Sequence, residues 1–382
     1  MKRVLIFSTA YLPLIGGAEV AVKEITDRIP DVKFVMFTAR LDPKLPMVEH
    51  IGNVEVHRMG KGTALDKLRL IWQGPRQAHN LGKFDLVWSI MASYAGFAAL
   101  CYKKRNPNVP YLLSLQEGDS KWDIYKHVWW CWPYFKQIFK KANHIQAISN
   151  YLATWAKRLG ATCPVAVVPN GVDVDKFTVH SSQLTVRKEI LEKLLIPSDA
   201  KVVITASRLV KKNGIGDLIA AMAKFSSEVH LLIAGTGELE AKLRKQTEYF
   251  GVKKKVHFLG NVSHMELPKY LWASDIFCRP SLSEGLGNAF LEAMVADLPV
   301  VATPVGGIPD FLKDGETGLF CKVGDSQDIT EKINRIFSDQ TLADKLRTNG
   351  RKLVQEKYYW EKIAAQMRNI FNNLSESASQ SV

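Results

Sequence analysis

The amino-acid sequence predicts an α/β protein built from two doubly wound domains. Three observations support this fold class. The 382 residues, 47% of them hydrophobic, suffice for two cores. Short apolar segments alternate with helical segments, as they do in parallel sheets covered on both faces. This alternation restarts after a polar stretch near the middle of the chain. We expect domains over residues 1–180 and 181–360, followed by a C-terminal helix and disordered tail over 361–382.

The first domain begins with an apolar segment that follows Lys2 and Arg3 and could be mistaken for a signal peptide. Its apolar run is broken early, and the pair Gly16-Gly17 stands where a cleavage site would be, so a buried strand is the better interpretation. The strands expected in this domain are 4–8, 32–38, 54–59, 85–90, 111–115, 144–149 and 165–169. Helical segments fall between most of them.

The second domain follows the polar stretch 173–198, which we interpret as the connection between domains. Its expected strands are 202–207, 230–235, 255–260, 275–280, 299–303 and 318–323. The tail from Ser375 is rich in serine, and we expect it to be disordered.

Composition narrows the class of protein. The net charge of +13 is concentrated in residues 1–180, where 24 Lys and Arg face 14 Asp and Glu, leaving +3 for the remainder. This asymmetry suits anionic lipid headgroups, a phosphorylated acceptor or nucleic acid. The five cysteines are an odd set without a C-x-x-C pair, which favours the reducing cytosol over a disulfide framework or zinc site. No segment has the ~18 uninterrupted apolar residues of a transmembrane helix.

The segment 279–310 carries the most informative pattern. Glu284 and Glu292 are eight residues apart around a glycine-rich turn that opens a helix. Gly285 and Gly287 remove side chains that would block a ligand, and Asn288 can cap the helix. The N–H groups at the helix start favour an anion, and carboxylates accept hydrogen bonds from vicinal hydroxyls. The segment therefore predicts a site for a phosphorylated, hydroxyl-rich ligand such as a nucleotide sugar.

This pattern resembles the donor-binding signature of the retaining, nucleotide-sugar-dependent glycosyltransferases of family 4. Glu284 and Glu292 match the family's E-x7-E pattern, and Pro280-Ser281, Pro299–Thr303 and Gly306-Gly307 stand where the family has them. The resemblance implies the GT-B fold, in which two Rossmann-like domains face one another across a cleft. It also implies transfer of a hexose-type sugar from a nucleotide diphosphate sugar to an acceptor hydroxyl.

Further candidates follow other predicted strands, where open parallel sheets bind ligands. The family usually has an arginine at position 208 and a lysine five residues later, where this chain has Asn213, so we expect Lys212 to supply the second charge on the diphosphate. Gly16-Gly17 correspond to the family's N-terminal glycine loop. The expected catalytic residues are Glu284, Arg208 and Lys212, and the expected donor-binding residues are Gly16, Gly17, Gly235, Gly285, Leu286, Gly287, Asn288 and Glu292.

Many relatives carry a histidine after the strand equivalent to 111–115, where it touches the donor sugar. This chain has Gln116 to Asp119 there. Glu117 or Asp119 could replace the sugar contact or orient the acceptor, and both could equally be ordinary loop acids. The nine histidines form no metal-binding pattern, so we expect no metal and no cofactor besides the nucleotide sugar as co-substrate.

Residues 121–142 contain four tryptophans, four other aromatic residues and five lysines. Tryptophan and tyrosine favour the membrane interface and lysines favour anionic headgroups, which indicates an interfacial anchor or a port for a lipid acceptor. The same composition is typical of single-stranded nucleic-acid binders, and also of a helix that packs its aromatic residues into the core.

The leading hypothesis is a cytoplasmic retaining glycosyltransferase, peripheral on the inner face of the cell membrane, with a glycan or lipid-linked acceptor and no nucleic-acid partner. An alternative within enzymes is a nucleotide-sugar 2-epimerase or a phosphorylase of the same fold. An alternative from another class is a basic membrane-binding or nucleic-acid-binding protein without enzymatic activity.

Overall fold

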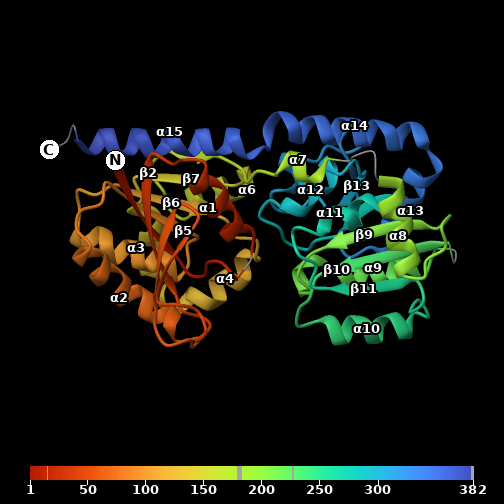
Figure 1. Ribbon diagram of the computed structural model, residues 1–382, viewed down its shortest axis with the longest axis horizontal. Helices are drawn as coiled ribbons and strands as arrows, with labels where there is room; N and C mark the ends of the chain where they lie inside the picture. The colour runs from red at the N-terminus through yellow and green to blue at the C-terminus, as the bar shows by residue number, and fades with distance from the viewer. Residues whose placement is uncertain (15, 179–182, 226–227, 380–382) are drawn as a thin grey trace. The chain divides into compact units, whose positions relative to one another are not determined.

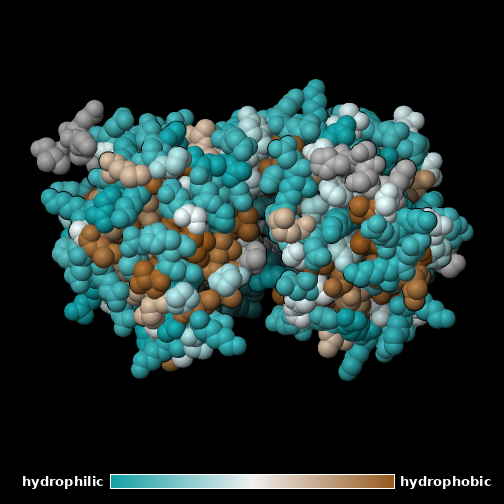
Figure 2. Space-filling model, viewed as in Figure 1, coloured by the Kyte–Doolittle hydropathy of each residue, from teal (hydrophilic) through white to brown (hydrophobic). Residues whose placement is uncertain are grey.

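The computed structural model describes residues 1–14, 16–178, 183–225 and 228–379, and the chain forms two compact units (Figure 1). Unit 1 comprises residues 1–171 together with 360–382, and unit 2 comprises residues 172–359. Residues 179–182 of the expected polar connection and 380–382 of the expected tail lie outside the described residues. Figure 2 shows that hydrophilic side chains cover most of the visible face of each unit, with apolar side chains between them.

Unit 1 contains an eight-stranded sheet in the order β3-β4-β2-β1-β5-β6-β7-β8. All its neighbouring strands are parallel except β3 and β4. The order reverses between β1 and β5, where a doubly wound sheet has its ligand-binding crevice. The strands are β1 (Lys2–Ser8), β2 (Val32–Ala39), β3 (Val48–Ile51), β4 (Val54–Met59), β5 (Leu86–Ile90), β6 (Tyr111–Leu115), β7 (His144–Ala147) and β8 (Val165–Val167).

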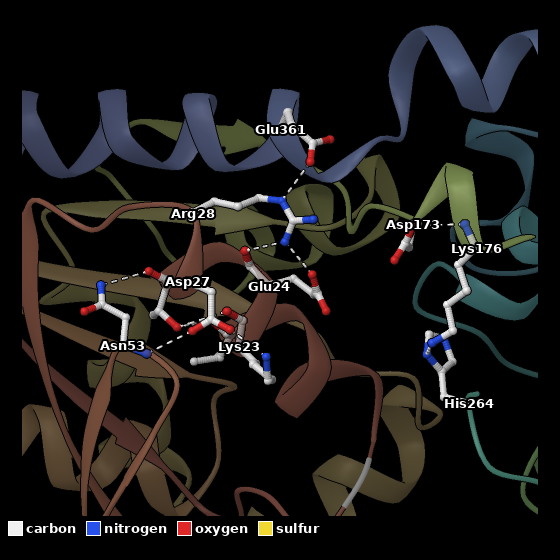
Figure 3. Close-up of polar contacts among 11 residues, drawn as sticks. Lys23, Glu24, Asp27, Arg28, Asn53, Asp173, Lys176, His264 and Glu361 are labelled. Atoms are coloured by element: carbon white, nitrogen blue, oxygen red, sulfur yellow. Dashed lines mark hydrogen bonds and ion pairs between the residues drawn. The ribbon is translucent and has the colours of Figure 1, made fainter.

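Strand β3 is absent from the sequence-based prediction. It forms an antiparallel hairpin with β4 at the edge of the sheet, and its residues alternate between exposed and half-buried. The hairpin turn is fixed to the end of helix α1 (Gly17–Asp27): the backbone N–H of Asn53 donates to Asp27 Oδ1 at 2.9 Å, and its side-chain amide donates to the carbonyl of Thr26 at 3.0 Å (Figure 3).

Helices cover the unit 1 sheet. Those after α1 are α2 (Asp66–Asn80), α3 (Tyr94–Arg105), α4 (Lys121–Val128), the 3-10 helix η1 (Trp129–Cys131), α5 (Trp132–Lys140), α6 (Asn150–Arg158) and α15 (Trp360–Ser379). Local sequence explains their ends. The Ser149 hydroxyl caps α6 by accepting from the N–H of Leu152. Three basic residues in the last turn of α3 interact favourably with the negative end of its helix dipole.

The C-terminal helix α15 belongs to unit 1, although it follows unit 2 in the sequence. Its buried face, which includes Ile363 and Met367, joins the unit 1 core. The ring centroid of Phe371 lies 6.0 Å from that of Phe34 and 5.1 Å from that of Trp88. The helix continues past Ser375, where we predicted disorder to begin. The Ser375 hydroxyl donates to the carbonyl of Phe371 one turn earlier, so serine is accommodated within the helix.

Unit 2 contains a six-stranded parallel sheet in the order β11-β10-β9-β12-β13-β14. Its strands are β9 (Lys201–Ala206), β10 (Val229–Ala234), β11 (Val256–Gly260), β12 (Ile276–Arg279), β13 (Val300–Ala302) and β14 (Leu319–Phe320). The order reverses between β9 and β12. The loops that follow these two strands therefore lie at the point where such sheets bind ligands.

The helices of unit 2 surround this sheet. They are α7 (Val174–Phe177), α8 (Gln183–Lys193), α9 (Ile215–Met222), α10 (Glu240–Tyr249), α11 (Leu267–Trp272), α12 (Asn288–Val295), α13 (Ser326–Ser338) and α14 (Gln340–Lys357), with the 3-10 helices η2 (Lys211–Asn213) and η3 (Ile308–Asp310). Helix α12 differs from the prediction at its start. The capping position is Gly287, and Asn288 is the first helical residue, because the turn requires the left-handed backbone that Gly287 adopts at φ 94°.

Candidate functional site

An arginine that the sequence analysis did not select lies at the centre of the unit 2 site. Arg279 ends β12 and is 5% exposed. Its Nη2 donates to Glu284 Oε2 at 2.6 Å, its Nη1 donates to the carbonyl of Ala206 at the end of β9, and its guanidinium lies 4.2 Å from the centroid of the Phe290 ring. Burial lowers the pKa of Arg279, and the charges of Glu284 and Glu292 oppose this effect. Arg279 thus connects β9, β12 and α12.

Glycines bring the backbone close around Glu284. The side-chain Oε1 of Glu284 accepts from the N–H of Gly285 at 3.1 Å. The backbone carbonyl of Glu284 accepts from the N–H of Gly307 at 3.2 Å. A Cβ on Gly306 would lie 1.7 Å from the same carbonyl, and Gly306 has φ 58°. Glycine at position 306 is therefore required by the approach of one backbone segment to another. Gly285 and Leu286 are buried beside it.

Glu292 lies one turn into α12 and contacts His264, which in turn contacts Lys176. His264 Nε2 is 3.1 Å from Glu292 Oε1. On the other side of the ring, His264 Nδ1 is 2.8 Å from the Nζ of Lys176 on α7, as Figure 3 shows. The sequence analysis missed both residues. Separations of 28 and 88 positions along the chain leave no local pattern from which these contacts could be predicted.

The loop after β9 lies against the loop after β12. The carbonyl of Lys212 accepts from the N–H of Leu282 at 2.6 Å, which places Lys212 next to the loop that carries Glu284. Arg208 lies two residues after β9 and is exposed. Asn213, which occupies the position of the family's lysine, is buried, and its Nδ2 donates to the carbonyl of Arg208 at 2.7 Å. The departure at Asn213 therefore supports the backbone of this loop.

The adjoining strand end contributes Gly235. This residue follows β10, and its N–H donates to the carbonyl of Gly260 at 2.7 Å, which joins the ends of β10 and β11. A Cβ on Gly235 would lie 2.0 Å from the carbonyl of Ser207, so the loops after β9 and β10 touch. The structure thus brings together the predicted residues of unit 2.

The remaining predicted residues belong to unit 1. Gly16 caps α1, and Gly17 is its first residue. Glu117 follows β6 and is 6% exposed; its Oε1 accepts from the N–H of Ala92 after β5 at 2.6 Å, and Oε2 has no hydrogen-bond partner among the described residues. Burial raises the pKa of Glu117 to about 7. Asp119 is exposed.

The aromatic segment 121–142 is divided between the core and the surface. Phe135, Ile138 and Phe139 of α5 are fully buried. Four other side chains are each more than 60% exposed, and we call them the aromatic patch: Trp122, Trp129, Trp130 and Tyr134. Lysines accompany them, with Lys126 Nζ 5.3 Å from the Trp122 ring centroid and Lys104 Nζ 5.7 Å from that of Tyr134. The buried face of α5 thus packs into the core, whereas the aromatic patch lies on the surface.

The described part of the chain contains neither a metal-binding cluster nor a helix that could span a membrane. Residues 1–14, 16–178, 183–225 and 228–379 contain no group of three or more His, Cys, Asp or Glu placed to hold a metal ion. Over the same ranges, every helix is too short or too polar to cross a membrane.

Comparison with known families places the chain. The Glycosyltransferase Family 4 model matches residues 15–176, and the Glycosyl transferases group 1 model matches residues 186–353, so the two matches together span most of the sequence. The chain belongs to glycosyltransferase family 4. The predicted family and the predicted class of enzyme are thereby confirmed.

Individual relatives of this family 4 glycosyltransferase agree with that assignment. An uncharacterized glycosyltransferase of Methanocaldococcus jannaschii, MJ1607, is 32% identical over 54% of this chain and 53% of its own length. The GDP-mannose-dependent alpha-(1-6)-phosphatidylinositol monomannoside mannosyltransferase of Mycobacterium tuberculosis is 28% identical over 61% of this chain and 62% of its own length. The matched segments thus span about half to three fifths of these two relatives.

The solved structure of Anabaena HepE in complex with UDP and glucose superposes with a TM-score of 0.82 over 97% of this chain and all of that chain, at 19% identity. This likeness confirms the predicted GT-B fold class, with a doubly wound sheet in each unit that is parallel apart from strand β3 of unit 1.

Proposed function

We propose that this chain is a retaining glycosyltransferase that moves a hexose-type sugar from a nucleotide diphosphate sugar to an acceptor hydroxyl of a lipid-linked or cell-envelope glycan. The observation that carries the proposal is the pair of carboxylates in unit 2. Glu284 and Glu292 are each held by a basic or imidazole side chain, and their side chains are 13% and 12% exposed. Both are therefore fixed in place while remaining accessible to a ligand.

Unit 2 supplies the donor contacts in this proposal. Glu284 accepts hydrogen bonds from hydroxyls of the donor sugar, and Glu292 accepts from the ribose. Arg208 and Lys212 bind the diphosphate, together with the N–H groups at the start of α12. Gly235 lets the loop after β10 approach the loop that carries Arg208. The complex of HepE with UDP and glucose supports a nucleoside diphosphate sugar as the donor.

The reaction needs no nucleophilic side chain. The acceptor hydroxyl attacks the anomeric carbon on the face from which the diphosphate departs, so that the C–O bond forms where the old bond breaks and configuration is retained. A phosphate oxygen of the leaving group takes the acceptor proton. Arg208, Lys212 and the α12 N–H groups stabilise the charge that develops on the diphosphate, and alignment of the two substrates supplies the rest of the acceleration.

Unit 1 supplies the acceptor side in this proposal, with the Gly16-Gly17 backbone approaching the donor. Glu117 is suited to a sugar contact because its Oε2, which lacks a partner among the described residues, can donate to a hydroxyl when the carboxyl is neutral. Asp119 is exposed two residues later and can accept from one. A phosphatidylinositol mannoside is the acceptor named for the mycobacterial relative, which supports a lipid-linked glycan here.

The aromatic patch provides a contact with the membrane that would hold such a lipid. Its tryptophans and tyrosine suit the interface between headgroups and acyl chains, and neighbouring lysines attract anionic lipids. Residues 1–180, which include the aromatic patch, carry the larger share of the positive charge, and this supports contact of that part of the chain with anionic lipids. We accordingly place the enzyme on the cytoplasmic face of the cell membrane.

The test is donor turnover and binding by Glu284→Gln and Glu292→Ala variants, with exposed Glu316 changed to Gln as a matched control. Thermal shifts with UDP-, GDP- and ADP-sugars first identify the donor. Loss of one charged hydrogen bond should reduce kcat/KM by roughly tenfold or more in each variant, because such a bond contributes about 1.5 kcal/mol or more. Near-wild-type values in both variants would refute the assignment. Donor conversion without any acceptor would indicate an epimerase instead.

A further inference from the structure

The carboxylate of Glu292 is connected to two residues that no sequence pattern selected. We propose that His264, itself held by Lys176, positions Glu292 for the ribose of the donor, which makes His264 and Lys176 positioning residues of the nucleotide site. This inference rests on the proposed function, because it assumes that Glu292 receives the ribose hydroxyls.

The hydrogen-bonding groups allow only one arrangement of protons when His264 is neutral. The Lys176 ammonium can donate but cannot accept, so His264 Nδ1, 2.8 Å away, must be the acceptor. The ring proton therefore lies on Nε2, which donates to Glu292 Oε1 at 3.1 Å. A neutral imidazole in a single tautomer thus links an ammonium group to a carboxylate.

Packing fixes the imidazole and the lysine in place. Asp173 caps α7 by accepting from the N–H of Lys176 at 3.1 Å. The next residue, Phe177, is fully buried. Its ring forms a T-shaped contact with the His264 ring at a centroid distance of 5.3 Å, and its carbonyl accepts from Trp272 Nε1 at 3.0 Å. Helix α7, the loop after β11 and helix α12 thereby meet at one point.

This arrangement prepares Glu292 for a ligand. The hydrogen bond from His264 occupies one carboxylate oxygen and restricts rotation of the carboxylate, so less side-chain freedom remains to be lost when a ribose binds. Lys176 keeps the imidazole in the tautomer that donates. Without His264, the Glu292 carboxylate could still accept hydrogen bonds from the ribose, but it would be free to rotate.

The experiment compares ribose recognition in variants. Dissociation constants are measured by calorimetry for UDP, GDP and ADP and for their 2′-deoxy counterparts, and the nucleotide that the wild-type protein binds defines the pair used. We expect wild-type protein to prefer the ribonucleotide by about tenfold, the effect of one hydrogen bond to a carboxylate. His264→Ala should bind it several-fold more weakly and reduce the preference below about threefold. Lys176→Met should change both quantities in the same direction.

Two further variants separate positioning from a general loss of structure. His264→Gln retains a side-chain N–H near the place of Nε2 and should recover part of the preference. His257→Gln alters another histidine of unit 2, on β11, and should leave the preference unchanged. Circular dichroism verifies folding, and Lys176→Met and His264→Gln decide the question if His264→Ala is unfolded.

The outcomes distinguish this inference from the proposed function. If wild-type protein shows no preference for ribose and Glu292→Ala binds normally, the donor assignment itself is refuted, and the positioning role with it. If Glu292→Ala loses the preference but the folded His264 and Lys176 variants keep the wild-type value, the positioning role alone is overturned.

Discussion

Replacing Glu117 with glutamine should stabilise unit 1 in alkaline solution, because burial disfavours the charged form of this carboxyl. Glu117 is 6% exposed, and only its Oε1 has a partner among the described residues, the N–H of Ala92. Glutamine has the same shape and can accept from Ala92 through its own oxygen. The substitution removes the charge while keeping the hydrogen bond.

The magnitude follows from the pKa. Burial, assisted by the charge of Asp119, raises the pKa of Glu117 from 4.5 to about 7, although the backbone N–H groups of Ala92, Gln116 and Glu117 favour the charged form. The folded state therefore binds more protons than the unfolded state between these two values. The contribution of Glu117 to the stability of the folded state is therefore fully present below pH 4.5, and it is lost as the pH rises through 7. The total loss is about 3 kcal/mol, and the Glu117→Gln variant should escape it.

The assay is urea unfolding of both proteins between pH 5 and pH 9, followed by tryptophan fluorescence. Eight of the nine tryptophans lie in unit 1, so this signal reports mainly on the unit that contains Glu117. Asp119→Asn is the control, because it removes a nearby exposed charge but should retain most of the pH dependence. The reasoning is refuted if Glu117→Gln is no more stable than wild-type protein at pH 8, or if both proteins lose stability equally as the pH rises.

Two other predictions concern the Arg279 ion pair and the aromatic patch. Arg279→Met should destabilise unit 2 by about 3–5 kcal/mol in urea unfolding followed by circular dichroism, because it leaves the charge of Glu284 largely buried without its partner. The double variant with Glu284→Leu should recover part of this loss, and a cost below about 1 kcal/mol for the single variant would contradict the assigned role. The double variant Trp129→Ser, Trp130→Ser should sediment with phosphatidylglycerol vesicles at least tenfold more weakly than wild-type protein. Tyr249→Ser, an exposed aromatic residue of unit 2, is the control, and equal binding by both variants would exclude the aromatic patch as the membrane contact.

The sequence predicted most strands because buried parallel strands are apolar along their length. β5 and β6, for example, are buried at every position, and their ends lie within one residue of the predicted ones. Strand β3 was missed because it is an exposed antiparallel edge strand of four residues. Its alternating pattern is too short to distinguish from a loop. The place of α15 was missed for another reason: an apolar helix face shows that a partner exists without showing which sheet it covers.

The sequence predicted those residues of the candidate site that lie close together along the chain. The positions of Glu284 and Glu292 follow from a turn and a helix that are contiguous in sequence. Arg279 could have been found, since an arginine at the end of an apolar strand, five residues before a glutamate, indicates a buried ion pair. His264 and Lys176 could not, because tertiary packing alone brings them to Glu292.

Because α15 packs on unit 1 but is translated after unit 2, it affects the order in which the two units can fold during synthesis. Synthesis proceeds from the N-terminus, so unit 2 has its whole sequence once Tyr359 has left the ribosome, whereas unit 1 still lacks the helix that covers Phe34 and Trp88. At roughly 5–20 residues per second, translation of residues 172–359 takes about 10–40 s. During that time the nascent N-terminal sheet carries an uncovered apolar face. The part of the enzyme that is translated first is therefore the last to complete its fold.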